Sequence, residues 1–167
     1  MKTKLIVVLL TAFLTTTWLQ PASADVDTAR IYAGGGLGFN DLDGASDSAT
    51  GWQILGGYDL GIRLGEFDTA VEIGFMSSGD FDFSIPGFGV VASESAEGLW
   101  ATWVPSIVVK DKISALGRIG LDFGDDDGLM LGIGGQYDIS PAFFMRVEYV
   151  IRDDIDSFQF NLLYQFK

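Results

Sequence analysis

The sequence predicts an all-β fold: an eight-stranded, antiparallel, up-and-down transmembrane β-barrel. Three observations carry the prediction. Segments of about ten residues alternate apolar and polar side chains along the chain, as the strands of such barrels do. An export signal occupies the N-terminus. The mean hydropathy is positive, at +0.29, yet no later run reaches the roughly 18 apolar residues of a membrane-spanning helix.

The first residues have the three parts of a secretory signal peptide. Two lysines precede an apolar core over residues 5–14, and Ala22-Ser23-Ala24 is typical of a cleavage site. A membrane anchor is the alternative, but the apolar core is shorter than the roughly 20 residues that span a bilayer. We therefore expect residues 1–24 to be removed and residues 25–167 to form one outer-membrane barrel domain.

Period-two alternation predicts the strands in order. They cover residues 30–39, 51–60, 67–76, 97–109, 113–123, 129–138, 143–152 and 158–167. In the third, Val71, Ile73 and Phe75 alternate with small or polar residues, a pattern that favours strand over helix. The fourth is apolar on both faces and is interrupted by Pro105, so its faces stay unassigned. The last sets large apolar side chains against mostly polar ones: Phe158, Phe160, Leu162, Tyr164 and Phe166 against Gln159, Asn161, Gln165 and Lys167.

The connections alternate between short and long. Those over residues 61–66, 110–112 and 139–142 are short, whereas the others carry insertions. Outer-membrane barrels have short periplasmic turns and longer external loops, so both termini are expected in the periplasm. Aromatic residues cluster near both strand ends, as two interfacial girdles require. The alternative is that aromatic residues simply favour strands.

The polar face of the strands decides between a membrane barrel and a soluble, lipocalin-like barrel. That face is rich in glycine: Gly34, Gly36, Gly38, Gly74, Gly120, Gly132 and Gly134. Glycines suit a cramped interior between eight strands, whereas on a water-facing exterior they would weaken the sheet without gain. We therefore place this face in the lumen and the apolar face against lipid.

Charged residues share the lumen face. Glu72, Arg118 and Glu148 are predicted at similar heights, with Arg146 one layer lower and Gln136 on the same face. Buried charges persist only when paired, and arginine binds carboxylates bidentately. Two interpretations remain: a salt-bridged plug that fills the lumen, which the small bore favours, or a charged gate in a narrow pore.

Composition excludes several classes of function. The formal net charge of −13 makes nucleic acid an improbable partner. The absence of cysteine excludes disulfides and a lipid-modified cysteine. The absence of histidine removes the commonest general base and zinc ligand, so we expect no enzyme, no cofactor and no metal site.

Two stretches resemble a known family. Leu131-Gly-Ile-Gly-Gly-Gln-Tyr-Asp-Ile-Ser-Pro-Ala-Phe-Phe-Met-Arg-Val-Glu-Tyr149 resembles the sixth and seventh strands of the OmpA-like and opacity-type outer-membrane β-barrels, which also end in an aromatic-rich strand. Residues 109–123 resemble the family's fourth turn and fifth strand. The resemblance implies the fold and the Gram-negative outer membrane. Family members include membrane-stabilising anchors, adhesins and weak porins, and we expect no peptidoglycan-binding domain like that of OmpA, and hence no cell-wall tether, in this chain.

The predicted loops cover residues 40–50, 77–95, 124–128 and 153–157, and they are acidic. The longest carries Phe81, Phe83 and Phe88, which suggests contact with a partner or a lipid headgroup; a rigid hairpin is an equal alternative. Asp125-Asp126-Asp127 contains oxygen ligands for Ca²⁺ or Mg²⁺, but its spacing does not match a calcium loop, so a solvated loop is favoured.

Two functions follow from these expectations. The first is a structural or surface-interaction barrel that stabilises the outer membrane or presents its loops. The second is a narrow, porin-like channel for small solutes. We expect a monomer that contacts outer-membrane lipid and lipopolysaccharide, with divalent ions as one hypothetical bridge, and an extracellular partner reached through the loops.

Overall fold

The structure, a computed structural model, describes residues 27–43, 45 and 47–167. The predicted signal peptide lies outside these residues. One short 3-10 helix, η1 (Thr28–Arg30), precedes the strands. Within the described residues, no helix has the length and apolar character needed to cross a bilayer.

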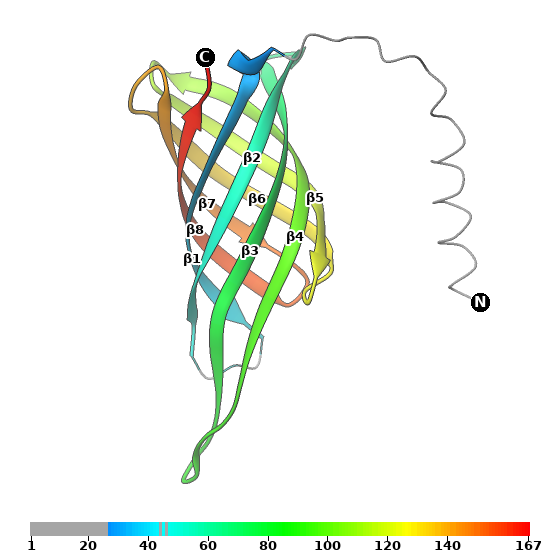
Figure 1. The fold of residues 1–167 in the computed structure, drawn as a ribbon, viewed down its shortest axis with the longest axis vertical. Helices are drawn as coiled ribbons and strands as arrows, with labels where there is room; N and C mark the ends of the chain where they lie inside the picture. Colours follow the sequence, from blue (N-terminus) through cyan, green and yellow to red (C-terminus); the bar gives the residue numbers. More distant parts are fainter. Residues whose placement is uncertain (1–26, 44, 46) are drawn as a thin grey trace, which may run out of the picture.

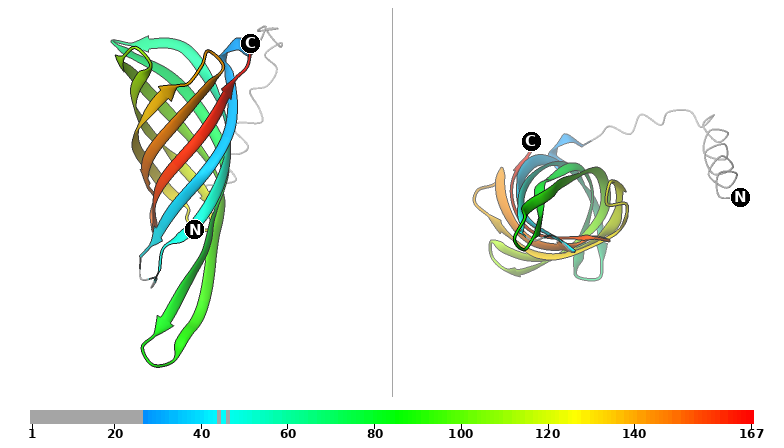
Figure 2. Two further views of the ribbon diagram at one scale, coloured as in Figure 1. Left: turned by 90° about the vertical axis from the view of Figure 1, so that its left-hand side faces the viewer. Right: turned by 90° about the horizontal axis from the view of Figure 1, so that it is seen from below.

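Eight antiparallel strands form one closed barrel (Figures 1 and 2). In chain order they are β1 (Ile31–Leu42), β2 (Ala49–Leu64), β3 (Phe67–Ile85), β4 (Gly89–Lys110), β5 (Ile113–Gly124), β6 (Gly128–Asp138), β7 (Phe143–Ile151) and β8 (Ile155–Gln165). Each strand pairs with its sequence neighbours, and β1 closes the ring on β8. Closure pairs the backbone groups without a free edge, as a bilayer requires. The predicted fold class is confirmed.

Two strands are much longer than predicted. β3 continues to Ile85 and β4 begins at Gly89, so residues 77–95 form most of a β-hairpin rather than a loop. The pairing of β3 with β4 shifts its register between Ser77 and Asp80. Such an irregularity breaks period-two alternation, which explains why the sequence pattern ended at Met76.

β4 has two defined faces. Leu99 and Trp103 point outward, with 61% and 36% of their surfaces exposed, whereas Trp100 and Val104 are 1% and 2% exposed in the lumen. Both faces are apolar because the lumen itself contains an apolar cluster. Its buried members are Tyr32, Leu55, Met76, Trp100, Met130, Phe144, Val150 and Leu163.

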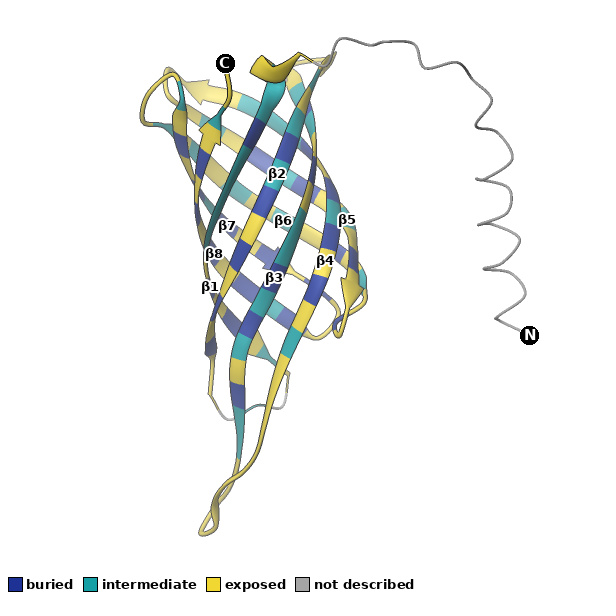
Figure 3. Ribbon diagram, in the orientation of Figure 1, coloured by how far each residue is buried: buried dark blue, intermediate teal, exposed yellow. Residues whose placement is uncertain are grey.

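Buried and exposed positions alternate along the strands (Figure 3), and their residue types are inverted relative to a water-soluble protein. Ile73 and Ile133 are 69% and 71% exposed on the outer surface, while Glu72 and Glu148 are each 1% exposed inside. In water this arrangement would lower the stability of the fold for two reasons. The apolar outer surface would remain exposed to solvent, and the buried charges would lose their hydration. In a bilayer, the outer surface is matched to lipid.

The two ends of the barrel differ. The turn end carries the short connections and both ends of the described barrel, at the top of Figure 1; the loop end carries the β3–β4 hairpin, which projects at the bottom. At the turn end the ring centroids of Phe143 and Tyr164 lie 5.1 Å apart, and Tyr164 lies 5.2 Å from Phe166. Trp52 and Phe75 lie 5.8 Å apart toward the loop end. These outward rings are placed as interfacial girdles are.

Candidate functional site in the lumen and at the loop end

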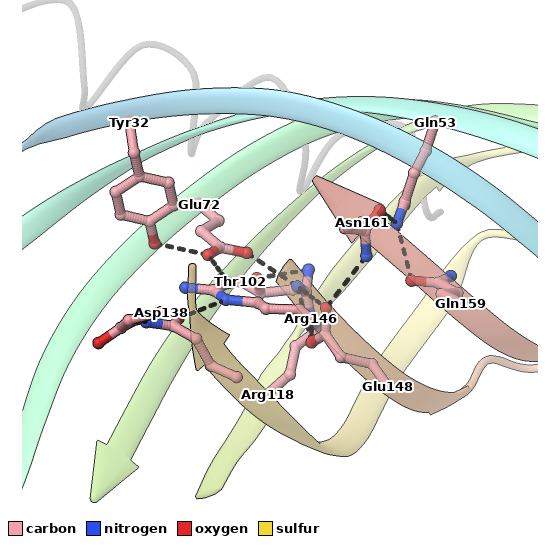
Figure 4. A network of polar contacts seen from close by, with 11 residues as sticks. Tyr32, Gln53, Glu72, Thr102, Arg118, Asp138, Arg146, Glu148, Gln159 and Asn161 are labelled. Carbon is pink, nitrogen blue, oxygen red and sulfur yellow. Dashed lines mark hydrogen bonds and ion pairs between the residues drawn. The ribbon is translucent and has the colours of Figure 1, made fainter. Parts of the chain in front are cut away.

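Four charged side chains from three strands meet in the middle of the lumen (Figure 4). Glu72 comes from β3, Arg118 from β5, and Arg146 and Glu148 from β7. Arg118 Nη2 lies 2.8 Å from Glu72 Oε2, and Arg146 forms an ion pair with Glu72 Oε1. Arg118 also contacts both oxygens of Glu148, at 3.0 and 3.1 Å. Two carboxylates thus face two guanidinium groups, and the four formal charges cancel.

Neutral side chains complete the network. Tyr32 donates its hydroxyl to Glu72 Oε1 at 2.5 Å, and Asn161 donates to Glu148 Oε2 at 3.3 Å. Arg146 Nε donates to Gln136 at 2.9 Å. The guanidinium of Arg118 also lies 4.7 Å from the ring centroid of Trp100. Bidentate pairing, hydrogen bonding and stacking together offset the desolvation of these charges.

Amide side chains extend the network toward β2 and β8. Gln53 donates to Gln159 Oε1 at 2.8 Å and to Asn161 Oδ1 at 2.7 Å. The network therefore joins side chains across the lumen rather than along one wall. We expect this hydrogen-bonded network to be rigid, because moving one side chain would leave the polar group of another without a partner.

Glycines make room for these large side chains. A Cβ atom on Gly57 would lie 2.1 Å from Cζ of Tyr32, so the tyrosine ring occupies the space above that glycine. A Cβ atom on Gly134 would lie 2.7 Å from Cγ of Glu148. At Gly34 the atom nearest to such a Cβ is instead a backbone carbonyl oxygen of β8, at 2.1 Å. Both the network side chains and the close approach of neighbouring strands therefore account for glycine on the lumen face.

A second polar cluster lies nearer the loop end. Arg152 Nε donates to Asp122 Oδ2 at 2.8 Å, and its Nη1 donates to Ser157 at 2.9 Å. Ser157 in turn donates to Asn40 Oδ1 at 2.5 Å, and Asn40 donates to the Ser78 carbonyl at 2.7 Å. All five residues are buried. The cluster ties β5 to β8, β1 and the base of the hairpin.

A cavity of about 510 Å³ opens at the turn end of the lumen. Its lining includes Tyr32 and Arg146 but neither Arg118 nor Glu148, so the cavity ends at the charged network. Lys112 and Asp138 also line it, so the cavity holds charges of both signs.

The structure brings together all five lumen residues named from the sequence: Glu72, Arg118, Arg146, Glu148 and Gln136. Sequence reasoning missed Tyr32, Gln53, Gln159 and Asn161, and also Thr102, whose hydroxyl accepts a hydrogen bond from Arg118 Nη1 at 3.4 Å. It also missed the cluster around Arg152. One signal was available: Arg152 shares the period-two face of Arg146 and Glu148, and Asp122 shares that of Arg118.

The predicted contact residues of the long loop need one correction. Phe81 is only 1% exposed and packs with Ala49 and Ile155, so its assignment to a contact surface is wrong. Phe83 packs against the same cluster and is half-buried. Phe88 lies at the hairpin tip and is 85% exposed. The inward turn of Phe81 results from contact with distant strands.

Charge is distributed unevenly between the two ends. The carboxylates of the loop half are Asp41, Asp43, Asp47, Asp80, Asp82, Glu94, Glu97, Asp122, Asp125, Asp126, Asp127, Asp153, Asp154 and Asp156. Its one described cation, Arg152, is buried with Asp122. In the part of the chain that the structure describes, the exposed or half-buried cations lie at the turn end: Arg30, Arg63, Lys110, Lys112 and Lys167. Among the described residues, no three acidic side chains are grouped closely enough to hold a metal ion.

Solved structures with the same architecture are transmembrane barrels. A designed transmembrane β-barrel matches with a TM-score of 0.56 at 14% identity, over 80% of this chain and 92% of its own. Ail of Yersinia pestis in a phospholipid nanodisc matches at 0.53 and 15%, over 81% of this chain and 99% of its own. Ail crystallised with the heparin analogue sucrose octasulfate matches at 0.50 and 15%, over 81% and 95%. These likenesses show the fold.

A search among curated proteins found no match to the chain. The sequence does match the outer membrane protein β-barrel domain over residues 6–166, nearly its whole length. Together with the inverted burial, the closed ring and the girdles, this match shows that the chain belongs to the outer-membrane β-barrel family.

Proposed function

We propose that this chain is a non-enzymatic, monomeric outer-membrane barrel whose role is contact at the cell surface through its loop end. The observation that carries the proposal is the β3–β4 hairpin, which projects well beyond the barrel rim (Figure 2). The side chains at its tip are apolar and solvent-exposed: Phe88, Ile85 and Val90 are 85%, 51% and 58% exposed. An exposed apolar surface of this kind marks an interaction site.

The hairpin is built to hold its tip away from the membrane. Beyond Ser77 and Glu97, β3 and β4 pair with each other and not with β2 or β5. At its base Phe81 is fully buried against Ala49 and Ile155, which fixes the stem on the barrel. Gly87 and Gly89 have φ angles of 89° and 79°, which glycine adopts readily in a tight turn.

The charge of the loop end defines the chemistry of the partner. Among the residues described, every exposed charge at this end is a carboxylate, so a partner with basic and apolar groups is favoured and a polyanion is repelled. Ail crystallised with a heparin analogue, a highly sulfated ligand. We infer that this chain does not share that ligand class, and that contact with lipopolysaccharide phosphates at the loop end needs bridging divalent cations.

The closed centre of the lumen supports the structural role over the channel. Arg118, Glu72 and Glu148 are each at most 4% exposed, and the turn-end cavity ends at their network. An ion passing this layer would have to separate paired charges in a narrow bore. A narrow pore remains the second candidate, because the network is a polar path if its side chains move apart.

The test compares the full chain with a variant in which residues 79–95 are replaced by a two-residue Asn-Gly turn. Bacteria displaying each form are applied to surfaces coated with polylysine, lysozyme or heparin. We expect hairpin-dependent adhesion to the two basic surfaces and none to heparin. Equal adhesion of the two forms would contradict the proposal. In planar bilayers the full chain is expected to pass no steady current, and open-channel steps would favour the pore.

A further inference from the structure

A small acidic cavity lies at the base of the hairpin. Its volume is about 160 Å³, and it lies between the β4 arm of the hairpin, the β5–β6 loop and the β7–β8 loop. Glu94, Asp125, Asp126 and Asp154 line it together with the apolar side chains of Phe81 and Ile155. The cavity therefore combines several carboxylates with an apolar wall.

Asp126 is the distinctive group in this cavity. It is 8% exposed, and its Oδ1 accepts a hydrogen bond from the Asp154 amide at 2.9 Å. Its Oδ2 is buried and has no hydrogen-bond partner among the described residues. The nearby cation Arg152 donates instead to Asp122 and Ser157. A buried carboxylate oxygen without a partner is unfavourable, and burial correspondingly raises the pKa of Asp126 above its ordinary value.

The size and lining of the cavity favour an organic cation over a bare metal ion. The described acidic side chains include no set of three placed to ligate a metal. The volume of about 160 Å³ far exceeds the roughly 10–15 Å³ that admits one water, so several non-hydrogen atoms fit. Phe81 and Ile155 offer apolar contact, which a hydrated metal ion does not use but a methylene chain does.

We propose that this cavity binds a primary alkylammonium group. The ammonium donates to Asp126 Oδ2 and lies within the field of Glu94, Asp125 and Asp154, while its methylene chain packs on Phe81 and Ile155. An ammonium carries three donors, so it supplies the missing partner of Oδ2 and a charge for the surrounding carboxylates. The ligand is a free diamine or polyamine, or the lysine side chain of a protein at the cell surface.

This inference goes beyond the proposed surface contact and does not depend on the hairpin tip. It requires only that the cavity is reached from outside the cell. A free diamine would bind even if the hairpin had no protein partner, so the two proposals fail separately.

The experiment uses the full barrel, folded in detergent micelles, with calorimetry and amide chemical shifts as readouts. The probes are 1,5-diaminopentane, the peptide Gly-Gly-Lys-Gly-Gly, and tetramethylammonium, which has the charge but no donor. We expect saturable binding of the diamine, the peptide or both, with shifts centred on the amides of Asp126 and Asp154. Tetramethylammonium should bind at least about tenfold more weakly, because the charge-assisted hydrogen bond is lost.

Two isosteric variants provide the matched control. Asp126→Asn removes the buried charge, whereas Asp127→Asn removes an exposed neighbouring charge that does not line the cavity. We expect Asp126→Asn to weaken diamine binding at least about tenfold and Asp127→Asn to change it less than about twofold. Equal weakening by both, binding of tetramethylammonium as tight as that of the diamine, or no saturable binding would overturn the proposal. The fold of each variant is verified by SDS gel electrophoresis, in which a folded barrel migrates differently before and after boiling.

Discussion

Arg118 on β5 and Glu148 on β7 form a bidentate ion pair that spans the lumen face of β6, the strand between them. Arg118 Nε and Nη2 lie 3.1 and 3.0 Å from Glu148 Oε1, and the two side chains are 1% and 0% exposed. The same guanidinium reaches Glu72, so one arginine links two buried carboxylates. Removing one partner of a buried pair lowers the free energy of unfolding far more than removing both, because it leaves an uncompensated charge buried.

We therefore expect Arg118→Met to destabilise the barrel by about 3–5 kcal/mol, because Glu148 loses its cation and keeps only the amide of Asn161. The measurement is urea-induced unfolding in lipid vesicles, followed by tryptophan fluorescence and by gel mobility without boiling. The double variant Arg118→Met/Glu148→Met leaves Glu72 paired with Arg146 and should be more stable than the single variant. A double variant that loses the sum of both single effects would show that the pair is not coupled.

Gly57 and Gly56 provide a matched test of lumen packing. A Cβ atom on Gly57 would meet the Tyr32 ring at 2.1 Å, whereas one on the outward-facing Gly56 meets only the Tyr32 carbonyl oxygen, at 3.9 Å. Gly57→Ala is expected to displace Tyr32 from Glu72 and to cost about 1–3 kcal/mol, as overpacking does. Gly56→Ala should be close to neutral in the same unfolding measurement. Equal effects would mean that contact with the Tyr32 ring does not set the cost.

The sequence predicted the barrel well because period-two alternation is a local property. Each strand reports its own lumen face, and the placement of Glu72, Arg118 and Glu148 at similar heights needed only residue counting from the turns. Tyr32 and Asn161 were harder, because their roles depend on which side chains lie opposite across the lumen. Strand stagger sets those neighbours, and alternation does not report it.

Phe81 shows the same limit at the loop end. From the sequence it stood in an aromatic-rich loop with Phe83 and Phe88, and nothing local distinguished the three. Its burial comes from Ala49 and Ile155, which are distant in the chain and meet only when the barrel closes. The register shift between Ser77 and Asp80 also hid the continuation of β3.

The different burial of these phenylalanines leads to opposite expectations for two substitutions. Phe81→Ala should destabilise the hairpin base by about 3 kcal/mol, the lower end for a buried phenylalanine, since the site is next to solvent-exposed loops. Phe88→Ala should leave stability within about 0.5 kcal/mol, because its ring is exposed, and should instead reduce adhesion to basic surfaces. Hydrogen exchange of the amides between residues 77 and 97 separates the two effects. Faster exchange in Phe88→Ala than in Phe81→Ala would contradict this assignment.

The buried carboxylate of Asp126 predicts a pH dependence that is confined to the loop end. Burial raises the pKa of Asp126, and the Asp154 amide offsets this only in part. A carboxyl group with a folded pKa above its unfolded value of about 3.9 favours folding when protonated, so its ionisation costs stability as pH rises through the folded pKa. After the intrinsic pH dependence of amide exchange is divided out, acidification from neutral pH should therefore raise the protection factors of the loop-end amides in the wild-type chain but not in Asp126→Asn.

Asp126→Asn keeps an oxygen acceptor for the Asp154 amide and removes the charge. We expect it to be more stable than the wild-type chain at pH 7 and to lose that advantage as the pH falls toward about 3.9, where the wild-type carboxyl is protonated as well. Asp127→Asn, at an exposed position, reports the general relief of repulsion among the acidic loops. Thermal unfolding of the three proteins across this range measures the difference. An Asp126→Asn variant that is less stable than the wild-type chain at neutral pH would show that the carboxylate has a cationic partner in the folded protein.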